Sequence, residues 1–233
     1  MDLKTIAAEK ALTYVQDGMV LGLGTGSTTT RFIKLLGESL QSQELKDVVA
    51  VPTSETTTRL ARELGIPLVT LSALSPHQAL PDVDLAVDGA DEIDDHLNLI
   101  KGLGRALLRE KIIEIHADVF IIIADESKLV AQLGRGPLPV EIVQFESGAQ
   151  VRWLNSLGCR AELWLEDNGE AILTDNGNYL VRCWFPDGIP DAYELARTLA
   201  GHPGIVEHGL FLDMANIAII AGEDGIQIKE RKQ

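Results

Sequence analysis

Four apolar runs of strand length, each followed by a polar or glycine-rich turn and then by a segment of helical period, most constrain the fold of this chain. The runs and their turns are 19–23 with 24–28, 48–51 with 52–56, 85–87 with 88–91, and 119–124 with 125–128. Repeated strand–turn–helix units predict a parallel sheet in an α/β fold. Because ligands bind at the carboxyl ends of parallel strands, the polar residues of these turns are predicted to share one site.

The segment after residue 137 has a different pattern, with shorter strands and two turns, 167–169 and 175–177, that read Asp-Asn-Gly and are typical of hairpins. Short strands at 216–221 and 226–228 are expected to return to the first sheet. The prediction is a Rossmann-like first domain of residues 1–133 and 208–233, with a smaller α+β domain of residues 134–207 inserted into it. Within the insertion we predict helices at 147–157 and 191–200 and strands at 140–145, 161–165, 171–173, 179–185 and 205–212.

The charge of the chain argues against several kinds of partner. Its 35 Asp and Glu against 20 Lys and Arg give a formal net charge of −15, so no broad basic surface is available for nucleic acid or an anionic membrane. No apolar run approaches the roughly 18 residues of a membrane span. Cys159 and Cys183 lack CxxC spacing and indicate a reducing compartment. We expect a soluble, cytoplasmic protein that binds a small polar or charged metabolite.

The segment Gly22–Thr28 ends a predicted strand and opens a predicted helix, so its backbone amides can cradle an anion such as phosphate. It is not a P-loop, because no Gly-Lys-Ser/Thr follows. It is also a poor dinucleotide fingerprint, since Ser27 stands in place of the third glycine and the second strand ends in Pro52-Thr53-Ser54 rather than in an acid. A glycine turn kept only for tight packing remains the alternative.

Seven acids lie between residues 82 and 95 without any Lys or Arg nearby. Asp88 and Asp91 flank Gly89-Ala90 just past a predicted strand, where a tight turn can aim both carboxylates at the site as proton carriers or hydroxyl acceptors. A Mg²⁺ ion on this pair remains an alternative, whereas the spacing does not fit a calcium loop. Glu92, Asp94 and Asp95 are expected to lie in a solvated loop.

Lys101 is the first cation after this acidic stretch, and it begins the segment Lys101-Gly102-Leu103-Gly104. The glycines allow the backbone to approach a ligand closely. The lysine could stabilise developing negative charge or only neutralise the nearby acids. Lys128, just after a strand, and Lys4, near the N-terminus, could each reach an anionic group at the same sheet edge.

Glu110 lies on a predicted helix that starts near residue 105. A step of 100° per residue places it on one face with Ala106 and Ile113, and roughly opposite Ile112 and Ile115. A carboxylate among small apolar neighbours is desolvated, which suits a general base. A solvated glutamate is the commoner alternative. The chain has no HExxH or GxSxG motif, so zinc hydrolase and serine hydrolase chemistry are disfavoured.

Taken together, these segments resemble the ordered motif series of type A ribose-5-phosphate isomerases over almost the whole chain. The matching segments are Gly24–Thr28, Asp88-Gly89-Ala90-Asp91-Glu92-Ile93, Lys101-Gly102-Leu103-Gly104, Arg109-Glu110-Lys111, Ser127-Lys128, Pro137-Leu138-Pro139-Val140-Glu141 and Thr174-Asp175-Asn176-Gly177-Asn178. The resemblance implies a Rossmann-like domain with a small α+β (ferredoxin-like) domain. It also implies an isomerase of the pentose phosphate pathway that interconverts D-ribose 5-phosphate and D-ribulose 5-phosphate without metal or cofactor, as a homodimer or homotetramer.

The resemblance also implies a role for each candidate residue. Glu110 would move the proton between C1 and C2 through an enediolate, while Asp88, Asp91 and Lys101 would handle hydroxyl protons, ring opening and the developing oxyanion. The residues implied to hold the substrate and its phosphate are Thr25, Gly26, Ser27, Thr28, Gly89, Ala90, Gly102, Leu103, Gly104, Lys128 and Lys4.

The chain departs from the family at Leu103, where a glycine is usual, and at Arg105, where a small residue is usual. Leu103 requires a backbone conformation open to a side chain, so the geometry near Lys101 is expected to differ. Arg105 is expected to pair with an acid or to add to the anion site. The competing hypotheses are a sugar-phosphate-sensing domain and a related sugar-phosphate deaminase or CoA transferase.

Overall fold

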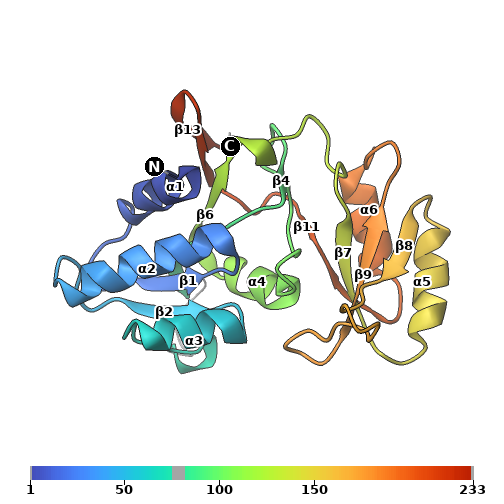
Figure 1. Ribbon diagram of the computed structural model, residues 1–233, viewed down its shortest axis with the longest axis horizontal. Helices are drawn as coiled ribbons and strands as arrows, with labels where there is room; N and C mark the ends of the chain where they lie inside the picture. The colour runs from blue at the N-terminus through green and yellow to red at the C-terminus, as the bar shows by residue number, and fades with distance from the viewer. Residues whose placement is uncertain (1, 75–81, 232–233) are drawn as a thin grey trace. The chain divides into compact units, whose positions relative to one another are not determined.

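The computed structural model describes residues 2–74 and 82–231, which form two compact units (Figure 1). Unit 1 consists of Met1–Ala90, Arg109–Lys128 and Met214–Gln233, and unit 2 of Asp91–Leu108 and Leu129–Asp213. These units differ from the predicted division mainly in residues 91–108, which group with the second unit although their sequence lies between two βα units of the first. The Asp88–Asp91 turn is therefore divided, and so is the stretch from Lys101 to Glu110.

Unit 1 is built on a six-stranded sheet with the order β13-β12-β6-β3-β1-β2. All neighbouring strands are parallel except β13, which pairs antiparallel with β12. The strands are β1 (Val20–Leu23), β2 (Val49–Pro52), β3 (Val83–Asp88), β6 (Ala117–Asp125), β12 (Ile217–Gly222) and β13 (Gly225–Glu230). This sheet confirms the predicted α/β class and the predicted return of the C-terminal segment.

Helices cover both faces of this sheet, because its strands are apolar on both sides. The helices α1 (Leu3–Leu12) and α2 (Ser27–Gln41) pack on one face, where Leu21 and Leu23 join the largest core of the unit. On the other face lies α4 (Leu107–Glu114), whose Ile113 is so close that a Cβ atom at Gly22 would come within 2.9 Å of it. The fourth helix, α3 (Glu55–Glu63), is capped by Ser54, whose hydroxyl accepts the amide of Thr57 at 3.0 Å.

The strand order changes direction at β1. The chain passes from β1 to β2 on one side and then returns to β3 on the other side of β1. At such a switch point the two connections leave in opposite directions, and the carboxyl ends of β1 and β3 border the place where ligands bind in open α/β sheets. The turns after these strands carry Gly24–Thr28 and Asp88–Ala90.

Unit 2 contains a four-stranded antiparallel sheet, β10-β7-β9-β8, and a small sheet, β11-β5-β4. The helices α5 (Ser147–Asn155) and α6 (Ala192–Ala200) cover the face of the larger sheet to which Val181 and Cys183 point. The strands are β4 (Glu92–Ile93), β5 (Leu99–Ile100), β7 (Leu138–Ile142), β8 (Arg160–Leu163), β9 (Tyr179–Trp184), β10 (Ile205–His208) and β11 (Leu210–Phe211). The unit is α+β, as predicted.

Two predicted strands of unit 2 differ in the structure. The run 205–212 is not one strand, because it breaks at Gly209 into β10 and β11, which belong to different sheets. Gly209 bonds to a residue beside each sheet: its amide donates to the carbonyl of Pro139 in β7 at 2.8 Å, and its carbonyl accepts the amide of Lys101, which follows β5, at 2.9 Å. The predicted strand 171–173 forms only isolated bridges, from Ala171 to Leu165 and from Leu173 to Tyr179.

Candidate active site

Asp88 ends β3 at the switch point and is only 1% exposed. Its Oδ1 atom accepts three hydrogen bonds, from the amide of Thr25 at 3.0 Å, the hydroxyl of Thr29 at 3.0 Å and the amide of Gly89 at 2.7 Å. Gly24 leaves room for this carboxylate, because a Cβ atom there would overlap the Asp88 side chain. The donors come from the turn after β1, from α2 and from the turn after β3, so they fix the orientation of Asp88 at the predicted edge of the sheet.

Thr25 belongs to a cluster of hydroxyl groups that joins the turns after β1 and β2. Its Oγ1 atom lies 2.9 Å from Thr53 Oγ1 and 2.8 Å from Ser54 Oγ, and Thr57 Oγ1 donates to the carbonyl of Gly24 at 2.8 Å. Both the hydroxyl and the amide of Thr25 are therefore used within the protein. These bonds hold the turn after β1 in place.

The anion cradle expected after β1 is the N-terminus of α2, which begins at Ser27. Gly26 caps the helix with φ of +132°, a conformation that side chains rarely adopt. The first amides of a helix have no partner within it and carry the positive end of the helix dipole, so they attract anions. Lys4 of α1 reaches this end, with its Nζ atom 2.9 Å from Ser27 Oγ.

Two lysines of unit 1, Lys128 and Lys4, act on the carboxylate of Asp125, which lies at the carboxyl end of β6. Burial alone would raise the pKa of Asp125, but hydrogen bonds from the hydroxyl and the amide of Ser127 and the charges of Lys128 and Lys4 hold that pKa below its ordinary value. Both lysines thus act on one carboxylate at this edge. A phosphate would find a helix N-terminus, a hydroxyl and two ammonium groups here.

Glu110 is 2% exposed on α4, so it is not the solvated glutamate of the alternative interpretation. Ile113, one turn further along, is also buried, whereas Ile112 and Ile115 on the opposite face are 42% and 59% exposed. Arg109, its neighbour, turns away to Glu55 of α3, with Nη1 2.9 Å from Oε1, and this hydrogen bond and charge lower the pKa of Glu55. The helical pattern in the sequence therefore placed Glu110 on the correct face.

In unit 2, Asp91 and Lys101 lie at the ends of the small sheet. The amide of Asp91 donates to Ile100 O at 2.8 Å, and its Oδ2 atom accepts the amide of Leu103 at 3.0 Å. Lys101 is 2% exposed, and its Nζ atom lies 5.3 Å from the centre of the Phe211 ring. The sequence left open that Lys101 only neutralises the nearby acids, and burial to this degree is not typical of a lysine with that role alone.

The turn after Lys101 resolves the expected conflict at Leu103. The left-handed conformations fall at Gly102, with φ of +111°, and at Arg105, with φ of +69°, whereas Leu103 has a negative φ. The amide of Arg105 closes the turn on Gly102 O at 2.9 Å. Arg105 pairs with Glu166, an acid outside the 82–95 cluster.

The structure corrects the prediction for Glu92, which is not part of a solvated loop. Its side chain is buried and accepts the amides of Gly134, Arg135 and Gly136 at 2.7, 3.3 and 2.5 Å. The sequence interpretation placed it with the neighbouring acids because its three amide donors are more than 40 residues away in the chain. Glu92 fixes the loop before β7 within unit 2.

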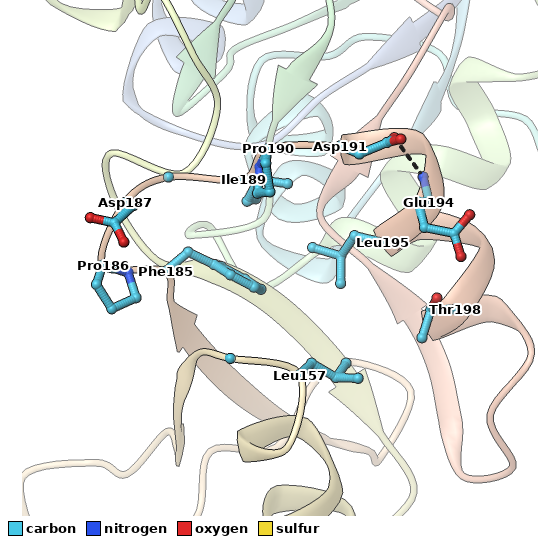
Figure 2. Close-up of a pocket in the computed structure, with 12 residues that line it drawn as sticks. Leu157, Phe185, Pro186, Asp187, Ile189, Pro190, Asp191, Glu194, Leu195 and Thr198 are labelled. Atoms are coloured by element: carbon cyan, nitrogen blue, oxygen red, sulfur yellow. Dashed lines mark hydrogen bonds between the residues drawn. The ribbon is translucent and has the colours of Figure 1, made fainter.

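Unit 2 also contains a pocket of about 410 Å³ that none of the predicted site residues lines (Figure 2). Its walls are mainly apolar, from Leu157, Phe185, Ile189, Pro190 and Leu195. Nearby, the carboxylate of Asp191 caps α6 by accepting the amide of Glu194 at 2.9 Å, as Figure 2 shows.

Over residues 2–74 and 82–231, no cluster of three or more His, Cys, Asp or Glu side chains has the arrangement of a metal site. Among the helices of the same residues, none has the length and apolar character needed to cross a membrane.

The structure thus distributes the predicted site residues over the two units. Unit 1 holds Lys4, Thr25, Gly26, Ser27, Thr28, Asp88, Gly89, Ala90, Glu110 and Lys128, and unit 2 holds Asp91, Lys101, Gly102, Leu103 and Gly104. The sequence interpretation counted Thr29 only among the hydroxyl donors for an anion and assigned no role to Ser54 or Thr57, although the hydroxyl-rich runs 27–30 and 53–58 beside two strand ends were a usable signal. These residues orient Asp88 and Thr25.

The fold and these polar groups define a class, namely an α/β protein with a helix N-terminus and a buried carboxylate at the switch point of its parallel sheet and a second buried carboxylate on a helix that covers the sheet. Residues 49–225 match the family model described as ribose 5-phosphate isomerase A (phosphoriboisomerase A). The chain therefore belongs to the ribose 5-phosphate isomerase A family.

Individual relatives agree over nearly the full length. A ribose-5-phosphate isomerase A of Roseiflexus castenholzii is 51% identical over 221 residues, covering 94% of this chain and 92% of that protein. A probable chloroplastic ribose-5-phosphate isomerase 3 of Arabidopsis thaliana is 47% identical over 97% of this chain and 82% of its own length. A solved D-ribose-5-phosphate isomerase in complex with phospho-erythronic acid superposes with a TM-score of 0.93 at 43% identity, covering 99% and 100% of the two chains. The Plasmodium falciparum enzyme superposes at 0.92 with 42% identity and 99% coverage of both chains.

Proposed function

We propose that this chain is an aldose–ketose isomerase that interconverts D-ribose 5-phosphate and D-ribulose 5-phosphate, with Glu110 as the base. The family membership supports the reaction. The observation that carries the assignment of the base is the burial of Glu110, because a carboxylate out of water is a stronger base for a weakly acidic C–H bond. The sensor, deaminase and CoA-transferase alternatives are not favoured by these relatives.

The reaction begins with capture of the phosphate. The N-terminus of α2, the hydroxyl of Ser27 and the ammonium groups of Lys4 and Lys128 bind it and so orient the sugar. Asp88, whose Oδ1 atom accepts three hydrogen bonds within the protein, accepts a hydrogen bond from a sugar hydroxyl and takes part in ring opening with Asp91. The open-chain aldose then has its C2–H bond available for removal.

The isomerisation itself is a proton transfer between two carbons. Glu110 removes the proton from C2 of the aldose, which forms a C1–C2 enediolate, and a proton passes between the two oxygens. Glu110 then returns its proton to C1, which gives the ketose and restores the carboxylate. Lys101 stabilises the negative oxygen of the enediolate. A positioned base contributes about 10²–10⁴-fold and a preorganised oxyanion donor about 10²–10³-fold to the rate.

Further parts of the proposal concern the protein in the cell. We infer a metal-independent enzyme, since the proton shift requires no redox or Lewis-acid partner when Lys101 supplies the positive charge. A homodimer or homotetramer in the cytoplasm completes the proposal, and it rests on the resemblance to the family and on the cysteine pattern of the sequence. Both cysteines are buried free thiols.

The test is conversion of ribose 5-phosphate to ribulose 5-phosphate by purified protein in excess EDTA, with Glu110→Gln beside it. We expect turnover by the wild type and a loss of kcat of at least 10²-fold in the variant. Glu38→Gln, an exposed glutamate on α2, is the matched control and should keep wild-type kcat. No turnover in the folded wild type would refute the reaction, loss of turnover in EDTA would refute metal independence, and full activity of Glu110→Gln would refute the base.

A further inference from the structure

Arginine and tryptophan side chains alternate along one face of the β8–β9 hairpin and lead to the turn after Lys101. Arg160 lies 4.5 Å from the centre of the Trp184 ring, and Arg182 lies 5.0 Å from both Trp184 and Trp164. Arg105 completes the series at 5.4 Å from Trp164. The pairing of Arg160 with Trp184 across the two strands places these side chains on the face opposite Cys183 and the α5–α6 core. We call Arg105, Trp164, Arg182, Trp184 and Arg160 the Arg–Trp stack.

Arg105 makes a second contact with the same hairpin. Its two terminal nitrogens lie 2.6 and 3.4 Å from the two carboxylate oxygens of Glu166, so the guanidinium pairs with both oxygens while one face stays over Trp164. The backbone of Arg105 is left-handed, with φ of +69°, where glycine is the less strained residue. Arginine therefore occupies a backbone conformation that favours glycine, and both terminal nitrogens of its guanidinium contact Glu166.

The turn that Arg105 closes adjoins two residues of the proposed mechanism, Asp91 and Lys101. The amide of Arg105 donates to Gly102 O at 2.9 Å, and the amide of Leu103, inside the turn, donates to Asp91 Oδ2 at 3.0 Å. Lys101 immediately precedes the turn. Glu166 is therefore connected to the Asp91 carboxylate through the side chain of Arg105 and the turn of residues 102–105.

We propose that Arg105 is a positioning residue for the isomerisation, in which Trp164 and Glu166 hold its side chain and thereby fix the turn that orients Asp91 and Lys101. This inference rests on the proposed function. An ion pair whose side chains are 41% and 47% exposed adds little to global stability, so its effect belongs in the geometry of the turn. A displacement of about 1 Å at a reacting group lowers a rate by roughly 10²-fold.

Three variants test the role of Arg105. Arg105→Gly removes the side chain and relieves the backbone strain, Glu166→Gln removes the charge of the partner without substituting a residue of the turn, and Arg105→Lys keeps the charge without the planar fork. We expect Arg105→Gly to lower kcat roughly 10- to 100-fold with KM within about twofold. The other two variants should show intermediate kcat values. Arg160→Gln, at the far end of the Arg–Trp stack, is the matched control and should keep wild-type kcat.

Thermal unfolding and amide hydrogen exchange at Leu103 and Arg105 complete the test. Faster exchange at these two amides in Arg105→Gly and Glu166→Gln, with an unchanged melting temperature, supports the anchoring. Wild-type kcat in Arg105→Gly would overturn the proposal, and so would an equal loss of kcat in Arg160→Gln. If the wild type itself shows no isomerisation, the proposed function fails, and unchanged exchange in Glu166→Gln would separately overturn the anchoring.

Discussion

The hydroxyl of Thr29 donates a 3.0 Å hydrogen bond to Oδ1 of Asp88. Thr29 is fully buried in the first turn of α2, so this bond ties the start of the helix that cradles the anion to the carboxylate at the end of β3. Two proposed functions, phosphate binding and hydroxyl proton transfer, are therefore coupled through one side chain that touches neither the phosphate nor the reacting carbons in the proposed mechanism.

Replacing Thr29 by valine tests this coupling. The change keeps the shape and removes a donor to a buried charged group, a loss of about 1.5–3 kcal/mol. We expect a lower melting temperature and a roughly tenfold lower kcat, because Asp88 can then reorient. Thr29→Ser, which restores the hydroxyl, should recover most of the activity. Assays of kcat and unfolding on the three proteins decide the point, and a Thr29→Val enzyme with wild-type kcat would contradict it.

Gly24→Ala tests the space reserved for Asp88. A Cβ atom at Gly24 would overlap the Asp88 side chain, so the carboxylate must move or β1 must separate from β3. We predict an activity loss of at least 10²-fold, since displacements of about 1 Å carry that cost. Gly148→Ala on α5, where the nearest atom would be 3.7 Å from the new Cβ, is the control and should be as active as wild type and up to about 1 kcal/mol more stable.

The lowered pKa of Asp125 predicts a pH-dependent contribution of Ser127 to stability. A carboxyl group whose pKa is lower in the folded than in the unfolded state stabilises the protein above the unfolded value of about 3.9, and this stabilisation is lost as the pH falls through the lower folded value. Ser127→Ala removes the hydroxyl donor and so raises the pKa of Asp125 towards its ordinary value.

We therefore expect Ser127→Ala to melt about 1–3 °C below wild type at pH 7, with a difference that shrinks as the pH falls below 4. Ser156→Ala is the control, because among the hydrogen bonds of the described residues the Ser156 hydroxyl bonds to the carbonyl of Trp153 and to no titratable group, so the effect of its removal should be independent of pH. A Ser127→Ala difference that stays constant from pH 7 to pH 3 would contradict the role of Asp125.

Much of the parallel sheet could be predicted from the sequence because the signals are local. Alternation of strand-length apolar runs with helical segments requires a parallel sheet, and the polar turns must then gather at the carboxyl ends of the strands. For this reason the sequence placed Gly26, Ser27, Asp88 and Lys128 at one edge of unit 1. Helical periodicity placed Glu110 on one face with Ala106 and Ile113, but it left a solvated glutamate as the commoner interpretation, and the burial of the side chain is a finding of the structure.

The parts that the sequence did not reveal depend on partners far away in the chain. Glu92 is buried by amides from residues 134–136, and the break at Gly209 follows from bonds to Pro139 and Lys101. Nothing near residue 105 in the sequence indicates Glu166. In each case the partner is distant in the chain, and no local pattern in the sequence identifies it.

The parallel pairing of β6 with β12 has a consequence for how the protein is made on the ribosome. These strands are neighbours in the sheet, yet residues 126–216 separate them in the chain. At roughly 5–20 residues per second, β6 emerges about 5–20 s before its neighbour exists. During that interval the apolar edge from Ile121 to Ala124 has no strand to pair with, so the nascent chain offers a binding surface for chaperones that the finished enzyme lacks.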